Sequence, residues 1–129
     1  MKPLIALLLT VFSTSAVAEW TKVGGNDTYT NYAELSTIHK SGNAVRMWSL
    51  VDFKVAQTGK GDNVQHLSTL RQEEYDCREE MRRLLTFSEH SKNMGAGEVV
   101  WQSGNTHAEF QTVSPGSVGE TLLKVACGK

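Results

Sequence analysis

The sequence predicts a domain of the α+β class, in which several β-strands are followed by one helix at the C-terminus. Residues 44–55 are rich in β-branched and aromatic side chains and alternate as a strand does. Ser117 and Glu120 have the spacing of a helix capping box and stand before a run with helical periodicity. Pro115–Gly116 separates the two patterns, so the helix comes last.

Residues 44–55 give the strongest strand signal. One face of this strand would carry Val45, Met47, Ser49, Val51, Phe53 and Val55. The other face would carry Arg46, Trp48, Leu50, Asp52 and Lys54. Because both faces hold apolar residues, the pattern predicts a central strand that is covered on one side and partly covered on the other.

Weaker strand patterns occupy residues 20–23, 28–32 and 98–103. Residues 33–39 have weak helical character, which predicts a single turn of helix. The predicted turns and loops are rich in Gly, Asn, Asp and Lys, and they fall at 24–27, 40–43, 57–63 and 92–97.

Residues 67–88 fit two different structures. By local propensity, residues 72–85 are helical, and the apolar side chains of this stretch fall near one stripe. Glu74 interrupts that stripe and no capping residue precedes it. A hairpin also fits, with strands at 67–76 and 81–90 joined by residues 77–80. Propensity alone favours the helix.

The C-terminal helix is predicted to run from Val118 to about Ala126, with Ser117 as its N-cap and Gly128 as its stop signal. Its apolar face would carry Val118, Leu122, Val125 and Ala126. Cys127 lies well off the centre of that face. If Cys127 pairs with another cysteine, either the last turn unwinds or the C-terminal end of the helix touches the sheet.

Residues 1–18 have the three parts of a cleavable secretory signal peptide. Lys2 is the positive start, residues 4–12 are apolar, and the segment ends in Ala16-Val17-Ala18, a pattern that signal peptidase accepts. The apolar run is shorter than the roughly 20 residues that span a bilayer, which argues against a membrane anchor. Cleavage is predicted between Ala18 and Glu19, which leaves one domain at 19–129.

The composition of residues 19–129 excludes some partners. Lys2 is the only charged residue before Glu19, so the remaining chain has 12 basic and 14 acidic side chains, a net charge near −2. This balance predicts neither a nucleic acid nor an anionic membrane surface as partner. No later segment is apolar enough to be transmembrane, and no cysteine follows the apolar run to carry a lipid.

Cys77 and Cys127 are the two cysteines of the chain. In an oxidising compartment, such a pair is most simply a disulfide. The alternatives are two free thiols or a redox site, although redox dithiols usually have the spacing C-x-x-C.

The motifs of catalysis and of metal binding do not occur in the sequence. The four histidines, His39, His66, His90 and His107, have no metal-ligand spacing and are expected on the surface or in loops. Ser117 lacks the G-x-S-x-G context of a serine nucleophile, and its helix-cap role accounts for it. The mixed charges at 73–83 predict a solvated, salt-bridged surface. We therefore predict no catalytic, cofactor-binding or metal-binding residues, and no enzyme.

Several segments resemble the bacterial surface-adhesin protein E-like domain family. They are residues 44–54 (AVRMWSLVDFK), 74–80 (EYDCREE), Met94–Gly95 with Val99–Val100, 115–120 (PGSVGE) and 124–129 (KVACGK). Their order and spacing match too, and the resemblance covers nearly all of residues 19–129. The C-terminal pattern is the most specific part.

The resemblance implies an antiparallel β-sheet with the C-terminal helix packed on it, tied to the sheet by Cys77 and Cys127. It therefore favours the hairpin for 67–88 over the helix. It also implies a Gram-negative bacterium and an exported, non-enzymatic binding module that resembles a binder of host matrix or serum proteins such as laminin and vitronectin. A homodimer is a further implication.

The sequence differs from the lipid-anchored adhesin of this family in having no cysteine for an anchor. The alternative function is therefore a soluble periplasmic accessory or structural protein without an adhesive role. The expected locations are the periplasm, the outer-membrane surface or the medium.

Overall fold

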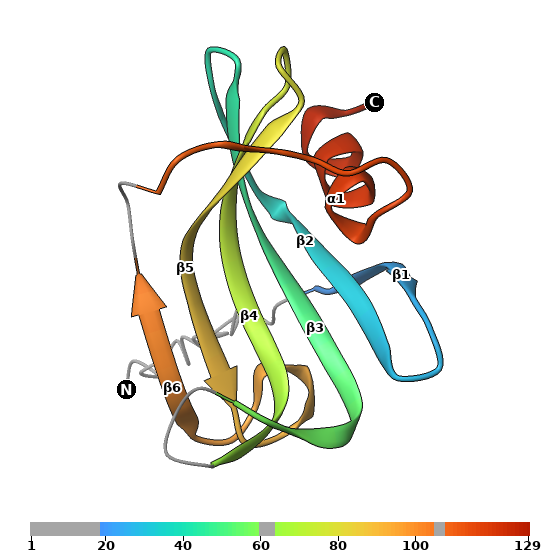
Figure 1. Cartoon of the computed structure of the whole chain (residues 1–129), viewed down its shortest axis with the longest axis vertical. Coiled ribbons are helices and arrows are strands. Elements are labelled where there is room, and N and C mark those ends of the chain that lie inside the picture. Colours follow the sequence, from blue (N-terminus) through green and yellow to red (C-terminus); the bar gives the residue numbers. More distant parts are fainter. Residues whose placement is uncertain (1–18, 60–63, 105–107) are drawn as a thin grey trace, which may run out of the picture.

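The computed structural model describes residues 19–59, 64–104 and 108–129. Six strands form one antiparallel sheet in which each strand pairs with its neighbour in the sequence, in the order β1 to β6 (Figure 1). The strands are β1 Thr21–Gly25, β2 Tyr29–Ser41, β3 Ala44–Thr58, β4 Gln65–Asp76, β5 Met81–His90 and β6 Val99–Gly104. A short strand, β7 Gln111–Thr112, also pairs with β5, and the helix α1 Val118–Cys127 ends the fold.

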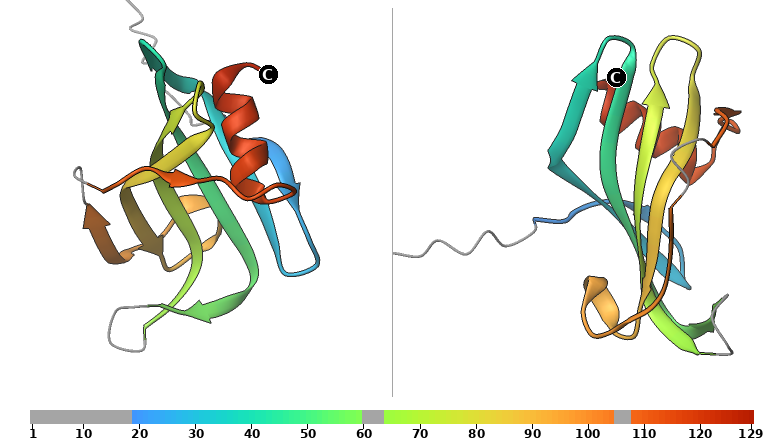
Figure 2. Two further views of the ribbon diagram at one scale, coloured as in Figure 1. Left: turned by 45° about the horizontal axis from the view of Figure 1, so that its top comes forward. Right: turned by 90° about the vertical axis from the view of Figure 1, so that its left-hand side faces the viewer.

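The long strands bend where their pairing shifts. The register of β2 against β3 shifts between Glu34 and His39, and that of β3 against β4 shifts between Asp52 and Gln57. Such bulges increase the local twist of a strand. The sheet therefore curves, and α1 lies across one of its faces (Figure 2). We call this the helix face and the opposite one the outer face.

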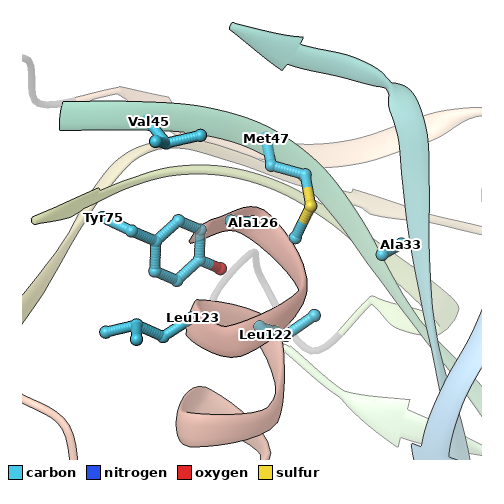
Figure 3. Close-up of a cluster of buried hydrophobic side chains, with 7 residues drawn as sticks. All are labelled: Ala33, Val45, Met47, Tyr75, Leu122, Leu123 and Ala126. Atoms are coloured by element: carbon cyan, nitrogen blue, oxygen red, sulfur yellow. The ribbon is translucent and has the colours of Figure 1, made fainter. Parts of the chain in front are cut away.

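The core lies between the helix face and α1 (Figure 3). Its buried side chains are Ala33, Val45, Met47, Tyr75, Leu122, Leu123 and Ala126. Three adjacent strands thus supply the sheet side of the core, and α1 supplies the other side. Burying a leucine side chain contributes about 1.5–3 kcal/mol, so Leu122 and Leu123 together are a large part of what holds α1 in place.

The outer face is covered by the connection between β5 and β6, which contains the 3-10 turn η1 Asn93–Gly95. The Ser68 hydroxyl donates to the Lys92 carbonyl at 2.6 Å and accepts from the Gly95 amide at 2.9 Å. Gly95 has a φ of 73° and packs against Leu50 and Leu70. The predicted partial cover on the second face of β3 is therefore confirmed.

The predicted faces of β3 hold along its first half. Val45, Met47 and Ser49 are buried on the helix face, and Leu50 is buried on the outer face. Val55, which was predicted to share the helix face, is 69% exposed. The shift in register after Asp52 explains the difference, because it ends the regular alternation of side chains.

The hairpin interpretation of residues 67–88 is confirmed, and the helix that propensity favours there is wrong. β4 and β5 pair along their length and are joined by residues 77–80. The carboxylate of Asp76 accepts from the amides of Arg78 and Glu79 at 3.0 and 2.9 Å, which closes the turn. The helical turn predicted for 33–39 is also wrong, because these residues continue β2. In both places sheet pairing overrides a weak local preference.

The remaining element predictions are largely confirmed. The strands predicted at 20–23, 28–32 and 98–103 correspond to β1, the start of β2, and β6. The loop predicted at 57–63 begins later than expected, since β3 extends to Thr58, and its residues 60–63 lie outside the described part of the chain.

The C-terminal helix has the predicted ends. The Ser117 hydroxyl accepts from the Glu120 amide, and Gly128 closes the helix with a φ of 70°. Cys127 remains helical, and its disulfide partner Cys77 lies in the turn between β4 and β5, with 5.7 Å between the two Cα atoms. The helix thus touches the sheet at its C-terminal end, and the last turn does not unwind. Lys129 extends the contact by donating to the Cys77 carbonyl at 3.0 Å.

We expect Cys127→Ser to lower the free energy of unfolding by about 4 kcal/mol, because the disulfide closes a loop of 50 residues. Urea unfolding followed by circular dichroism measures the change. Cys77→Ser and the double variant should lose the same amount, and Lys54→Ala, at an exposed position of β3, should lose little. A loss below about 1 kcal/mol in all three cysteine variants would contradict the structural role of this bond.

Candidate functional site

The helix face of the sheet carries a cavity of about 580 Å³ that opens to solvent beside the first turn of α1. Side chains of β2, β3, β4 and β5 form the floor and one wall. The segment that enters the helix, Gly116–Gly119, forms the opposite wall. The cavity therefore lies beside the N-terminal half of α1, whereas the disulfide joins its C-terminal end to the turn between β4 and β5.

A buried carboxylate lies at the centre of the charged wall of this cavity. Glu73 is only 3% exposed, and its Oε2 atom is 3.4 Å from a guanidinium nitrogen of Arg82. Its Oε1 atom has no hydrogen-bond partner among the described residues. Burial raises the pKa of Glu73, and the positive charges of Arg82 and Arg71 offset only part of this effect.

Two further polar groups in the cavity wall are buried without partners in the described chain. They are Asn31 Nδ2 and Arg71 Nε. The apolar part of the wall includes Tyr29 and Phe53, whose rings meet edge to face with centroids 6.3 Å apart. The cavity thus combines buried donors, one buried acceptor and an aromatic pair, which suits a small molecule that has both a polar and an apolar part.

Directly behind Glu73, the outer face carries a different arrangement. Arg46, Glu74 and Arg83 pair across β3, β4 and β5 in a single row. Glu74 accepts from Arg46 at 2.8 Å and from Arg83 at 2.6 and 3.1 Å. Burial would raise the pKa of Glu74, but the hydrogen bonds and charges of the two arginines outweigh it, so that the pKa is lowered. This row stabilises the sheet and leaves no carboxylate free for chemistry.

The predicted surface at 73–83 is salt-bridged, as expected, but the prediction that it is solvated is wrong for two of its members. Glu73 and Glu74 are both buried, on opposite faces of β4. The alternation of a strand separates the two side chains, and the prediction of a solvated surface came instead from the mixed charge pattern of this stretch. The signal that could have revealed the cavity was the period-two pattern of Thr69, Arg71 and Glu73.

The histidines differ from their prediction as well. His66 and His90 are buried in β4 and β5, whereas His39 is exposed on β2 and His107 lies outside the described residues. His66 contacts the Phe53 ring, and its Nδ1 atom is 3.5 Å from Glu89. Burial lowers the pKa of His90, whose Nε2 atom is 2.7 Å from the Ser88 hydroxyl. Within the described ranges, no three His, Cys, Asp or Glu side chains come together as metal ligands would.

A second candidate site is the outer edge of the sheet. β6 pairs on one side with β5 and has no second partner strand among the described residues. Val99 and Trp101 of β6 are 50% and 38% exposed, although both are large and apolar. An edge strand with exposed apolar side chains is a surface on which another chain can bind.

Of the predicted sites, Cys77 and Cys127 are brought together. The predicted cleavage residues Ala16 and Ala18 lie outside the described residues, whereas Glu19 is described and is exposed. In the part of the chain that the structure covers, no helix is long and apolar enough to cross a membrane.

We expect Glu73→Gln and Glu74→Gln to change stability in opposite directions at pH 7. The folded state favours the ionised form of Glu74, so its contribution is present at neutral pH and is lost as the pH falls through the lowered pKa. Glu74→Gln should therefore destabilise the protein at pH 7, by about 1–3 kcal/mol.

The folded state favours the protonated form of Glu73, so its contribution is present in acid and is lost as the pH rises through the raised pKa. Glu73→Gln, which mimics that protonated form, should therefore raise Tm at pH 7. Thermal unfolding at pH 7 and below pH 4 measures both effects, and both differences from the parent should shrink in acid. Two changes of the same sign at pH 7 would contradict these assignments.

The comparisons with known proteins agree with this fold. A family profile described as surface-adhesin protein E matches residues 20–128. No functionally curated protein matches the chain. A solved structure of Haemophilus influenzae protein E is similar with a TM-score of 0.62 at 11% sequence identity, covering 89% of this chain and 88% of that one.

Two other solved structures give the same result. Crystal form II of H. influenzae protein E has a TM-score of 0.60 at 10% identity and covers 88% of this chain and 97% of that one. Protein E from non-typeable H. influenzae has a TM-score of 0.62 at 10% identity and covers 89% and 79%. These likenesses concern the fold, whereas the profile spans nearly the whole described chain. The protein therefore belongs to the surface-adhesin protein E family.

Proposed function

We propose that this protein is an exported binding module that holds a matrix or serum protein of a host and catalyses no reaction. Membership of the surface-adhesin protein E family is the observation that carries the proposal. A small sheet domain with a disulfide suits such a role, because a covalent tie stabilises a domain of this size outside the cell.

We assign the binding surface to the outer edge of β6. Along one side, the backbone groups of this strand pair with no other strand of the described chain, so an extended segment of a partner can add to the sheet there. Trp101 supplies a large apolar contact of the kind that dominates binding energy at protein interfaces. The partners that fit are host proteins such as laminin and vitronectin, and a second copy of this chain is the other occupant that an open edge admits.

Export requires removal of residues 1–18. The protein isolated from its native cells should begin at Glu19, as the Ala16-Val17-Ala18 pattern predicts. Intact-mass spectrometry and N-terminal sequencing measure this directly. A chain that still begins at Met1 in the isolated protein would contradict the proposed export route.

Surface display and periplasmic residence are distinguished by protease treatment of intact cells. The adhesive function requires that the protein be digested without lysis. Full protection until the outer membrane is opened would instead support the alternative, a periplasmic accessory protein without an adhesive role.

Residues 19–129 should bind immobilised laminin or vitronectin saturably. Trp101→Ala should weaken that binding at least about tenfold, because an exposed tryptophan that a partner covers is a typical hot spot of an interface. Surface plasmon resonance measures the affinity. Leu35→Ala is the matched control, since Leu35 is apolar and 47% exposed but lies on β2, which three strands separate from β6 in the sheet.

Three outcomes would count against this assignment. Absence of saturable binding to either protein would contradict the adhesive function itself. Weaker binding by Leu35→Ala together with unchanged binding by Trp101→Ala would move the surface from β6 to β2. A parent that is dimeric by light scattering, with a monomeric Trp101→Ala variant, would assign the edge to a second copy of the chain.

A further inference from the structure

We propose that the cavity between the helix face and the first turn of α1 is a binding site for a small organic carboxylate with an apolar body. This site is separate from the outer edge of β6, since its walls come from β2 to β5 and from residues 116–122. A role in binding a host protein at β6 does not require a small ligand in this cavity.

Two hydrogen-bond donors in the cavity wall are buried without a partner among the described residues. Asn31 is 3% exposed, lines the cavity, and has no partner for its Nδ2 atom among the described residues. Arg71 lines the same wall and has a buried Nε atom without a partner. Most buried polar groups in proteins are hydrogen-bonded, so two orphan donors in one cavity indicate an acceptor that binds there.

Charged side chains of β4 and β5 line one wall of the cavity. The residues that line the cavity include two cations, Arg71 and Arg82, and one carboxylate, Glu73, so this wall has an excess of positive charge. Glu109 lies beside the same arginines in the adjoining pocket. The positive end of the dipole of α1 lies in the opposite wall, because Ser117, Val118 and Gly119 line the cavity there. An anion is the ligand that both walls favour.

Arg82 also lies close to the first turn of α1. Its guanidinium lies against Gly119, where an added Cβ atom would be only 2.8 Å from the Arg82 Cζ atom. A cation beside the N-terminus of a helix is electrostatically unfavourable. The ion pair with Glu73 is long, at 3.4 Å, compared with about 2.7–2.9 Å for a strong charged hydrogen bond. An anion in the cavity, beside both Arg82 and the helix terminus, would be attracted by both positive groups.

The size and apolar surface of the cavity select among anions. A volume of about 580 Å³ suits a small molecule and exceeds what a single inorganic ion needs. Tyr29, Val51 and Phe53 form an apolar wall that suits a hydrocarbon chain or a ring. The carboxylate of Glu73 would repel a doubly charged phosphate more strongly than a singly charged carboxylate. A monocarboxylate with an apolar body therefore fits best.

The test is calorimetric titration of residues 19–129 with 3-phenylpropionate. We expect one saturable site, with affinity at least tenfold higher than for 3-phenylpropionamide, which has nearly the same shape without the charge. Inorganic phosphate serves as the probe for an adventitious anion and should bind more weakly than 3-phenylpropionate. Equal binding of acid and amide, or tighter binding of phosphate, would overturn the proposal.

Two variants place the ligand in the cavity. Arg71→Met removes a donor and a charge from the wall, and Val51→Phe fills the apolar part. Each should weaken binding at least tenfold. Arg46→Met is the matched control, because it removes an arginine from the outer face, where it pairs with Glu74, and should leave the affinity within twofold of the parent. Full binding by both cavity variants would overturn the assignment.

A measurement on the parent chain keeps the test independent of the stability of the variants. In ¹H–¹⁵N spectra, 3-phenylpropionate should shift the amides of Asn31, Arg71 and residues 117–119. Shifts confined to β6, or the absence of any shift at millimolar ligand, would show that 3-phenylpropionate does not bind in the cavity and would refute the site. Binding to laminin or vitronectin is measured separately, so failure of one proposal is distinguishable from failure of the other.

Discussion

The packing of α1 against the helix face, fixed by the bond between Cys77 and Cys127, determines both the core and the cavity. A meander sheet of this size has no second layer of its own, and α1 is the element that covers its helix face. Leu122, Leu123 and Ala126 fill the contact beside the disulfide. Leu123 and Ala126 of α1 are buried in the core, whereas residues 116–119 line the cavity beside the start of the helix. The two halves of α1 thus have different surroundings, one apolar and one polar.

β4 illustrates how strongly strand alternation separates chemically similar groups. Glu73 and Glu74 are neighbours in the sequence, yet one faces the cavity and the other joins a row of arginines on the outer face. Burial raises the pKa of Glu73, whereas the two arginines beside Glu74 outweigh the effect of its burial and lower its pKa. Glu74 is bound by two guanidinium groups and links β3, β4 and β5. Neither the Oε1 atom of Glu73 nor the buried hydroxyl of Tyr75 near it has a hydrogen-bond partner among the described residues, so Glu73 is the less constrained carboxylate of the two.

Much of the fold could be predicted from local pattern, and the failures have physical causes. The alternation in 44–55 and the capping signals around Ser117 and Gly128 act within a few residues, so they were visible in the sequence. The helical propensity of 72–85 was misleading, because pairing with β3 on one side and β5 on the other outweighs it. The family resemblance supplied that long-range information. Only part of the cavity was predictable, since the alternation of β4 puts Thr69, Arg71 and Glu73 on one face, whereas the approach of Asn31 and residues 117–119 depends on how α1 packs.

The topology also dictates the order in which the chain can complete its structure. Each strand from β1 to β6 pairs with the preceding one, so the hairpins close over short loops and form quickly. The residues that cover the helix face, in contrast, are the last dozen of the sequence. Until α1 packs, the sheet therefore has one apolar face uncovered. The disulfide comes late in this order, since Cys127 lies in the last turn of α1 and reaches Cys77 only once that turn lies beside the connection between β4 and β5.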